Sequence, residues 1–394
     1  MACGAGRDPV VNTVQTLAGK EIVVAVTGSI AAVEIVKLIH ALRRCGASVQ
    51  PVMSAAAAGI VHPDALTYAA GRETICRISG LVEHVTFCGD GGSADLLLVA
   101  PCTANTIGKI ACGIDDTPVT TFASTAIGSG VPVIVVPAMH HSMFRHPAVA
   151  GHLRTLAGWG VVIAGPVIAE GKAKIAPVEE IVLRCERACT GGPLLGKKVL
   201  VTSGSCREPV DDIRVLTTRS TGRMGRALAL QAFRLGADVT VVHRDTFPCV
   251  NNIRADTAAE MCEAVLRSFG QGNADIYVSA AAISDFAPRR TGGKIPSGKP
   301  VSLALEPLPK LIDEVKERFS PEIIAFKLGT GQEDNARKMI AGGIRMVLVN
   351  APETMGSEDG NYTMMTVEGA VPLSGSKEAI AAEVWEAFSL LKNP

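Results

Sequence analysis

Glycine and hydroxyl-bearing residues directly follow apolar runs at two places in this 394-residue chain, in "VTGSIAA" (26–32) and in "VTSGSCREP" (201–209). A strand that ends in such residues before a helix leaves backbone N–H groups and hydroxyls free to face a phosphate. The same residue types also form ordinary turns and helix caps, so each stretch alone fits both interpretations. The chain lacks the G-x-G-x-x-G spacing that a dinucleotide pyrophosphate usually requires, which favours a mononucleotide over NAD.

Two further loops of the first half bring amide and imidazole groups to the ends of apolar runs. "APCTANTIGKIACGI" (100–114) follows the run DLLLVA, and "VPAMHHSMFRHP" (136–147) follows the run VPVIVV. The carboxyl ends of parallel strands meet at one edge of a sheet, so we expect both loops beside residues 26–32.

In the second half, "RSTGRMG" (219–225) places Ser220, Thr221 and Gly222 just before a helical pattern. That helix begins near Arg223. Its N–H groups, the two hydroxyls and the helix dipole would all face an anion, although a turn and helix cap alone also account for the residues.

Strands alternate with helices in both halves, which predicts parallel sheets covered by helices on both faces. The helix after the first strand carries its apolar residues, from Ile30 to Leu42, mostly along one face and ends at Cys45 and Gly46. The expected strands are 21–27, 95–100, 131–136 and 161–164, then 198–203, 238–243, 275–280, 322–327 and 345–350; helices over 223–235 and 376–391 are expected in the second half. The fold class is therefore α/β, with two doubly wound parallel-sheet domains. "ERACTGGPLLG" (186–196) is typical of a linker and predicts domains over 1–190 and 191–394.

The composition favours small-molecule chemistry. Lys plus Arg and Asp plus Glu are equal at 38 each, which indicates neither a nucleic-acid nor a membrane partner. Eleven cysteines without regular spacing indicate a reducing, cytoplasmic compartment, and the pair Cys185 and Cys189 has no neighbours that would complete a metal site. The chain has no run of about 18 apolar residues, and residues 1–18 lack the pattern of a leader peptide.

The two glycine- and serine-rich openings belong to motifs of two enzyme families. The loops at 100–114 and 136–147 resemble P-A-S-A-N-T and P-x-M-N-x-x-M-W of the flavin-containing cysteine decarboxylases. "TSGSCREPVDDIR" (202–214) is similar to T-A-G-x-T-R-E-P-I-D-x-V-R of a CTP-dependent ligase family, and "RSTGRMG" stands where that family has H-S-S-G-K-M-G. Over residues 19–390 the chain thus resembles the bifunctional phosphopantothenoylcysteine decarboxylase/phosphopantothenate–cysteine ligase family of coenzyme A biosynthesis, as an archaeal-type member.

The resemblance implies a flavodoxin-like flavoprotein domain of the HFCD type followed by a Rossmann-like ligase domain. FMN and Mg2+ are the implied cofactors, and 4'-phosphopantothenate, cysteine and CTP are the implied substrates. The ligase would form an acyl cytidylate that cysteine then attacks, and the decarboxylase would convert the product to 4'-phosphopantetheine. The resemblance also implies a homo-oligomer with trimeric decarboxylase contacts and dimeric ligase contacts, which together could close a dodecamer.

In the first half, the resemblance assigns residues to the flavin and to the substrate. Those implied around FMN are Gly28, Ser29, Ile30, Ser54, Thr103, Ala104 and Asn105. His84, in "LVEHVTF" (81–87), would be the catalytic histidine that manages the substrate thiol or carboxylate, whereas a lone histidine is otherwise more often structural. Asn105 would donate a hydrogen bond to the carboxylate that leaves as CO2. Oxidation of the cysteinyl thiol by FMN activates that loss, and the reduced flavin returns the electrons.

Two departures from the decarboxylase pattern affect the substrate site. The second loop has His140, with Met143 nearby, where the family generally has Asn; archaeal members share a His there. The clamp "GPVIAEGKAKIAP" (165–177) lacks the Cys that protonates the product in bacterial members. The candidates to replace it are Lys172, Lys174 and Cys102, although the lysines could instead grip the substrate phosphate.

In the second half, "GGKIPSGK" (292–299) carries the family's mobile lysine, so Lys294 would neutralise the triphosphate and act in catalysis. Asp285 would bind Mg2+ or cytidine, and Phe326 would lie near the cytosine. Lys327 would serve as a base or as a phosphate contact because the family's Glu is absent. The implied substrate-binding residues are Arg207, Thr218, Arg219, Ser220, Thr221, Gly222, Arg223, Ala281, Asp285, Lys294, Phe326 and Lys327. Thr218 replaces a family Asn, so Arg219 would strengthen this contact.

Two other functions compete with this interpretation. Some relatives of the decarboxylase keep the fold and the flavin pocket but act as regulatory subunits; loss of activity would favour that alternative. A dehydrogenase with two Rossmann units would require a dinucleotide-binding motif that the chain lacks.

Overall fold

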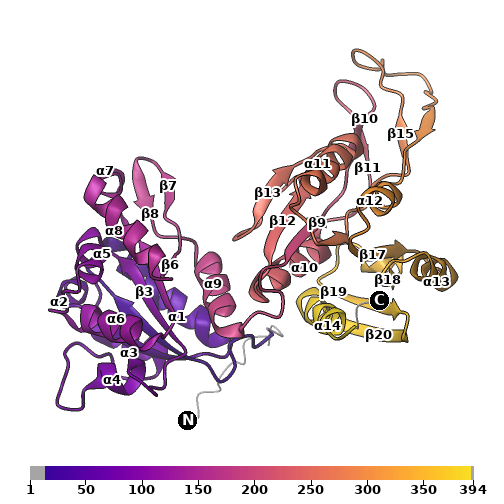
Figure 1. The fold of residues 1–394 in the computed structure, drawn as a ribbon. Helices are drawn as coiled ribbons and strands as arrows, with labels where there is room; N and C mark the ends of the chain where they lie inside the picture. The colour runs from indigo at the N-terminus through magenta and orange to yellow at the C-terminus, as the bar shows by residue number, and fades with distance from the viewer. Residues whose placement is uncertain (1–13, 392–394) are drawn as a thin grey trace, which may run out of the picture. The chain divides into compact units, whose positions relative to one another are not determined.

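The computed structural model describes residues 14–391 and divides into two compact units between Gly191 and Gly192 (Figure 1). The expectation that residues 1–18 contain no leader peptide concerns mostly residues 1–13, which lie outside this described part. Among the described residues, no helix is both long enough and apolar enough to cross a membrane.

The sheet of the first unit has the strand order β2-β1-β3-β4-β6, and every neighbouring pair is parallel. Its strands are β1 (Glu21–Val26), β2 (Ser48–Met53), β3 (Leu96–Cys102), β4 (Val133–Pro137) and β6 (Val162–Ile163). The chain order reverses between β1 and β3. At such a reversal the loops at the carboxyl ends diverge and leave a crevice for a ligand, as in the flavodoxin-like order.

Strand β2 is not among the strands expected from the sequence, because Gln50 and Pro51 interrupt its apolar pattern. Pro51 is tolerated since β2 is the first strand in the sheet order and, apart from a single bridge between Val52 and Ile75, pairs only with β1. The other four strands confirm the runs expected from the sequence.

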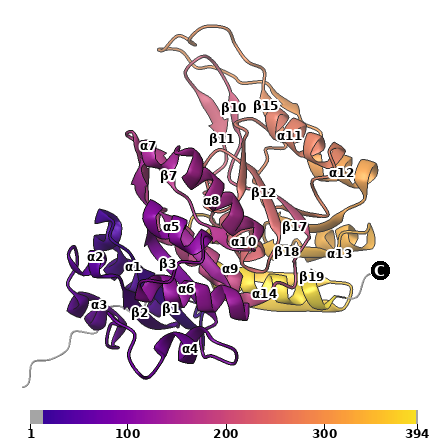
Figure 2. The same cartoon turned by 60° about the vertical axis from the view of Figure 1, so that its left-hand side comes forward.

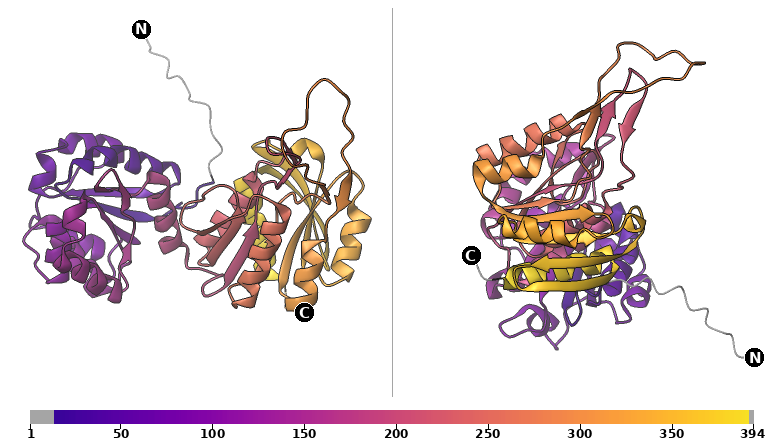
Figure 3. Two further views of the ribbon diagram at one scale, coloured as in Figure 1. Left: turned by 90° about the horizontal axis from the view of Figure 1, so that it is seen from above. Right: turned by 90° about the vertical axis from the view of Figure 1, so that its right-hand side faces the viewer.

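Helices cover both faces of this sheet (Figure 3, left). They are η1 (Ile30–Glu34), α1 (Ile35–Arg44), α2 (Ala55–Ala58), α3 (Pro63–Ala70), α4 (Glu83–Cys88), α5 (Ala104–Ala111), α6 (Pro118–Ser129), α7 (His141–Phe144), α8 (Pro147–Gly158) and α9 (Val178–Thr190). Alternate residues of β1 enter different cores: Val24 packs with the cluster that includes Leu38 and Ile181, and Val23 packs with the cluster that includes Phe122 and Leu156. Burial on both faces explains the continuous apolar runs.

The helix pattern after β1 is only partly as expected. Ile35, Leu38 and other apolar residues of α1 are buried, and the helix ends before Cys45 and Gly46 as the sequence indicates. Ile30 and Val33, however, are 77% and 50% exposed, because residues 30–34 form a 3-10 turn that takes them out of the α-helical stripe.

The sheet of the second unit has the order β13-β12-β9-β14-β17-β18-β19-β20. Its strands are β9 (Lys198–Thr202), β12 (Asp238–His243), β13 (Asn251–Arg254), β14 (Ile276–Ser279), β17 (Glu322–Leu328), β18 (Met346–Asn350), β19 (Asp359–Thr366) and β20 (Gly369–Ser376). The first six strands in this order are parallel and follow the Rossmann-like 3-2-1-4-5-6 arrangement, which reverses between β9 and β14. The antiparallel hairpin β19–β20, which the sequence analysis did not identify, extends the edge.

The helices of this unit are α10 (Arg223–Arg234), α11 (Ala258–Gly270), α12 (Leu311–Phe319), α13 (Glu333–Ala341), η2 (Pro352–Thr354) and α14 (Lys377–Leu390). The fully buried Trp385 of α14 donates a hydrogen bond from Nε1 to Leu228 O at 2.9 Å, which joins α14 to α10. The expected helices near 223–235 and 376–391 are confirmed.

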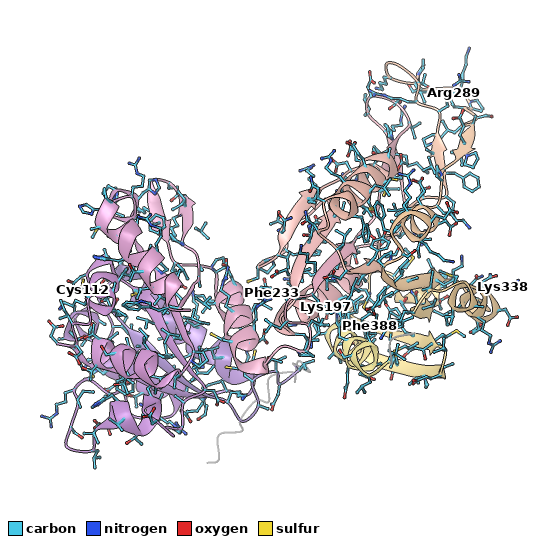
Figure 4. The ribbon with its side chains drawn as sticks, in the orientation of Figure 1. Cys112, Lys197, Phe233, Arg289, Lys338 and Phe388 are labelled. Carbon is cyan, nitrogen blue, oxygen red and sulfur yellow. The ribbon has the colours of Figure 1, made fainter. Side chains whose placement is uncertain are left out.

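Two short hairpins project from the second unit as an arm (Figure 1). They pair β10 (Arg207–Pro209) with β11 (Val215–Thr217), and β15 (Phe286–Pro288) with β16 (Leu305–Pro307). Arg289 lies in the outer part of this arm (Figure 4). The arm carries the expected Lys294 loop.

Candidate functional site

Three turns at the carboxyl ends of β1, β2 and β3 form the candidate flavin site of the first unit. Each turn begins a helix with a hydroxyl that accepts a backbone hydrogen bond: Ser29 from Ala31, Ser54 from Ala57, and Thr103 from Thr106. The hydroxyls therefore act as helix caps in this structure, as the simpler sequence interpretation allowed.

Thr27 and Gly28 hold these turns together. Thr27 Oγ1 donates to Pro101 O at 2.7 Å and accepts from Thr103 N at 3.1 Å, which ties the end of β1 to the loop after β3. A Cβ added to Gly28 would lie 2.6 Å from Ala56 Cβ, so only glycine lets α2 approach β1 this closely. The sequence analysis had not singled out Thr27, although its place at the end of the first apolar run was a usable signal.

The expected FMN residues Gly28, Ser29, Ser54, Thr103 and Ala104 thus occupy one edge of the sheet. Ile30 and Asn105 are exposed on the same turns, and the Asn105 amide is open to a ligand. The small residues around the crevice fit a phosphate that approaches the backbone closely.

The loop after β4 is joined to the clamp. Its strand β5 (Met139–His140) pairs antiparallel with β8 (Lys172–Lys174), which continues the hairpin from β7 (Val167–Ala169). His140 and Lys172 are register partners, so their side chains lie on the same face of this small sheet. The structure therefore brings together two residues that the sequence analysis had chosen for separate reasons.

The three proton-donor candidates differ in their surroundings. Lys174 Nζ forms an ion pair with Glu170 Oε2 at 2.8 Å and lines an apolar cavity of about 310 Å3 between α1, the clamp and α9. Lys172 is exposed beside His140. Cys102 is fully buried, and burial raises the pKa of its thiol far above the ordinary value, so Cys102 is poorly placed to protonate a product. Met143, in α7 next to this loop, is 49% exposed.

His84 lies on α4, which packs against α6 (Figure 2). Its ring is 6.4 Å from that of Phe122 in an edge-to-face arrangement. The Nδ1 atom of His84 is buried and has no hydrogen-bond partner among residues 14–391. No described hydrogen bond or ion pair joins His84 to the three turns or to the clamp, so within this unit the structure does not link the expected histidine to the expected flavin site.

In the second unit, a polar cavity of about 170 Å3 opens at the ends of β9 and β12. We call it the serine pocket; its lining residues are Ser203, Gly204, Ser205, Ser220, Thr221, Arg244 and Asp245. Ser220 and Thr221 were expected here. Ser203, Ser205, Arg244 and Asp245 were not identified as site residues, although an Arg–Asp pair after the VTVVH run was a usable signal.

Close packing of α10 against β9 shapes this pocket. A Cβ on Gly225 would lie 2.4 Å from Ser203 Oγ, and Ser203 Oγ donates to Gly222 O at 3.1 Å. Gly222 precedes α10 with a φ of 75°, a left-handed conformation that favours glycine. The start of α10 is thereby held beside Ser220 and Thr221, as the sequence indicated.

Other expected ligase residues lie around the pocket or away from it. Thr218 Oγ1 donates to Ala282 O at 3.4 Å, and Ala282 N donates to Gly204 O, so the segment with Ala281 lies next to the β9 turn. Arg219 is exposed. Arg223 donates from Nη1 to Gly356 O at 2.7 Å, which engages it with the loop after β18.

Lys294 lies on the arm and does not line the serine pocket. Its neighbours Gly293 and Ile295 donate backbone hydrogen bonds to the carboxylates of Asp212 and Asp211 at 3.2 and 3.0 Å. These contacts fix the lysine loop to the 211–214 turn. The structure therefore does not bring Lys294 to Ser220 and Thr221.

The remaining candidates are spread over the same half. Phe326 and Lys327 lie near the end of β17, half-buried, and the Phe326 ring packs edge-on to Tyr362 at 6.3 Å. Asp285 is exposed before β15, and the Arg207 side chain is exposed on β10. Among residues 14–391, no group of three or more His, Cys, Asp or Glu side chains is placed to hold a metal.

Comparisons with known proteins match both units. A family model described as a flavoprotein covers residues 11–188, and one described as the C-terminal domain of the DNA/pantothenate metabolism flavoprotein covers residues 194–390. The chain is 43% identical over 384 residues to the coenzyme A biosynthesis bifunctional protein CoaBC of Thermococcus kodakarensis, covering 94% of this chain and 95% of the relative. CoaBC of Vibrio vulnificus is 31% identical over 418 residues, covering 96% and 99%. A solved C-terminal domain of a CoaBC protein is 26% identical with a TM-score of 0.44, covering 51% of this chain and 97% of that domain.

Proposed function

The chain belongs to the family of coenzyme A biosynthesis bifunctional proteins CoaBC, and from this membership we propose how its two units divide the work. The enzyme ligates 4'-phosphopantothenate to cysteine with CTP and then decarboxylates the product to 4'-phosphopantetheine. We assign decarboxylation to residues 1–190 and ligation to residues 191–394. The observation that carries this assignment is that each unit has a parallel sheet of its own whose strand order reverses, at β1/β3 in one and at β9/β14 in the other, with hydroxyl-bearing turns at the carboxyl ends of its strands.

FMN is the cofactor of the first unit, in agreement with its flavoprotein family model. When bound, FMN supplies the oxidation and reduction that activate the cysteinyl carboxylate for loss as CO2. We assign its phosphate and ribityl chain to the turns of Gly28, Ser29, Ile30 and Ser54. The tight approach of Ala56 to Gly28 supports this assignment, because it brings the Ser54 turn and the Gly28 turn close enough to share one phosphate.

The substrate groups of the decarboxylase surround that flavin. We propose that the exposed Asn105 amide donates a hydrogen bond to the substrate carboxylate, with Thr103 and Ala104 beside it. His140 and Met143 contact the substrate from the loop after β4. A clamp lysine, Lys172 or Lys174, returns a proton to the carbon that has lost CO2, which completes the proton balance of the reaction.

We assign His84 to the substrate thiol or carboxylate. Its buried Nδ1 without a partner among the described residues supports a role in which a further group completes the hydrogen bond. The trimer expected for the decarboxylase unit would bring a second copy of the unit to this surface, and we propose that this trimer forms. We also propose the dimeric contacts expected for the ligase unit.

In the ligase, Ser220, Thr221, Gly222 and the start of α10 are proposed to hold the CTP triphosphate. Phe326 packs near the cytosine and Lys327 near the phosphates, while Ala281, Thr218 and Arg219 contact the acyl cytidylate. Lys294 must move from the arm to reach the triphosphate, with Arg207 and Arg223 as further cationic contacts.

Asp285 is the proposed Mg2+ residue. A single carboxylate fits a magnesium ion that is bound mainly through the nucleotide phosphates. Cys88, Cys102, Cys185 and Cys206 are buried thiols that form no disulfide, which fits a reducing compartment, and we propose the cytoplasm.

The test is a mass spectrum of the products after the full-length protein has been incubated with 4'-phosphopantothenate, cysteine, CTP and Mg2+. We expect 4'-phosphopantetheine. Accumulation of 4'-phosphopantothenoylcysteine alone would contradict the decarboxylase assignment and favour a flavin-binding regulatory unit. Formation of neither product would contradict the function as a whole.

A further inference from the structure

Arg244 is the one basic side chain among the described residues that line the serine pocket. It follows β12 directly, and β12 pairs in parallel with β9 up to Thr202, just before Ser203. Lys294, Arg219 and Arg223 do not line the pocket. A phosphate that enters the pocket therefore meets the guanidinium of Arg244 before any of the expected cations.

Asp256 orients the Arg244 side chain, but the guanidinium keeps N–H donors for a ligand. Its Nε lies 3.3 Å from Asp256 Oδ1, an ion-pair distance, and the side chain is only 24% exposed. The Nε atom is buried and has no hydrogen-bond partner within residues 14–391. A guanidinium has five N–H donors, and its planar fork matches the oxygens of a phosphate.

We propose that Arg244 binds the terminal phosphates of the nucleoside triphosphate in the serine pocket, a role that rests on the proposed ligase function. The sheet order places β9 and β14 between β12 and β17, which carries Phe326. Three strand spacings correspond to about 14 Å. A nucleotide with its base at Phe326 thus extends its phosphate chain across the sheet edge, and the far end of that chain reaches Arg244.

The neighbouring Asp245 gives the proposal a test of charge sign. It lines the same pocket with an exposed carboxylate, which repels a phosphate when no divalent cation is present. Removal of the positive charge at residue 244 and of the negative charge at residue 245 should therefore change nucleotide affinity in opposite directions.

Arg254 provides a matched control. Its Nη2 lies 3.3 Å from Oδ2 of the same Asp256, but the side chain is 75% exposed and does not line the pocket. Arg254→Gln removes an arginine partner of Asp256 just as Arg244→Gln does, without changing the charge of the pocket.

The experiment is calorimetric titration of the full-length variants with CTP and with CMP in Mg2+-free buffer containing EDTA. For Arg244→Gln we expect CTP affinity to fall about ten- to a hundredfold while CMP affinity changes by less than about twofold. Arg244→Lys should lose less, because it keeps the charge but not the fork. Asp245→Asn should strengthen CTP binding, and Arg254→Gln should leave it unchanged.

Three outcomes would overturn the inference. If Arg244→Gln and the parent protein bind CTP equally, the pocket does not receive the terminal phosphates, and the ligase function still stands. If Arg244→Gln keeps its melting temperature but loses CMP affinity as strongly as CTP affinity, Arg244 does not contact the terminal phosphates specifically. A parent protein that binds no CTP, either in EDTA or in a second titration with excess Mg2+, would contradict the proposed ligase function together with this role of Arg244.

Discussion

Lys172 and Lys174 lie two residues apart on β8, yet only Lys174 has an ion-pair partner, Glu170. Lys172 is instead the register partner of His140. We therefore predict that Lys172→Ala slows decarboxylation roughly a hundredfold, the scale of a lost general acid, whereas Lys174→Ala slows it less than about tenfold. The measurement is 4'-phosphopantetheine formation from supplied 4'-phosphopantothenoylcysteine, with bound flavin quantified by absorbance.

The pair of variants controls for the charge of the clamp, since each loses one lysine. Equal effects would contradict a specific role for Lys172 and favour the simpler view that both lysines grip the substrate phosphate. A larger effect at Lys174 would reverse the assignment.

The lowered pKa of Asp211 predicts that the arm loses stability in acid. Hydrogen bonds from the backbone N–H groups of Ile295, Ile213 and Arg214, together with the Arg214 side chain, hold the pKa of Asp211 well below its usual 3.8. A carboxyl group whose pKa is lowered by folding contributes stability above the usual pKa and loses it as pH falls towards the folded value. Asp211→Asn should therefore lower the melting temperature at pH 7, and this deficit should shrink below about pH 4.

Thermal melts of both proteins between pH 3 and pH 7 measure this difference. A deficit that stays constant over that range would mean that the charge of Asp211 is not what holds the Lys294 loop.

At the scale of elements, the approach of α2 to the end of β1 is the contact that shapes the proposed flavin site. Gly28→Ala places a Cβ 2.6 Å from Ala56 Cβ and 3.2 Å from its backbone carbon, so the two turns must separate. We predict a loss of about 1–3 kcal/mol in stability and of most bound FMN, measured by thermal melting and flavin absorbance. Ligase activity should be unchanged.

Gly59→Ala is the matched control, because its added Cβ would meet only Ala56 O at an ordinary 3.6 Å. It should retain flavin. If Gly28→Ala keeps its flavin as well, the crevice between the turns of β1, β2 and β3 is not the cofactor site.

At the scale of the whole molecule, each unit has its own sheet and its own core, so we expect the two reactions to be separable within one chain. Asn105→Asp adds a carboxylate where the substrate carboxylate is proposed to bind, and like charges side by side should slow decarboxylation at least about a hundredfold. With all ligase substrates supplied, 4'-phosphopantothenoylcysteine should then accumulate at the parental rate of ligation.

Quantification of that intermediate over time tests the separation. A fall in ligation rate in the Asn105→Asp protein would show that the two sites are coupled and would contradict independent units.

The sequence by itself determined the features that depend on local pattern. Continuous apolar runs such as EIVVAV predicted buried parallel strands, and residues such as Ser29 and Ser220 marked turns at their ends, because both signals depend on residues adjacent in the chain. Family motifs carried the resemblance further, to both reactions. The strand that contains Pro51 was not predicted, because the proline is acceptable through the strand's place in the sheet order and not through its residue pattern.

Only the tertiary structure decided which side chains share a site. Arg244 lies some forty positions from Ser203 in the chain, and the parallel pairing of β12 with β9 brings them into one pocket. Pairing of β5 with β8 set Lys172 beside His140, and hydrogen bonds to Asp211 and Asp212 fixed the Lys294 loop to the 211–214 turn. Burial of the sheet enclosed Cys102. Such neighbours depend on strand order and register, which are fixed by burial of the whole sheet and leave no mark in the spacing of residues along the chain.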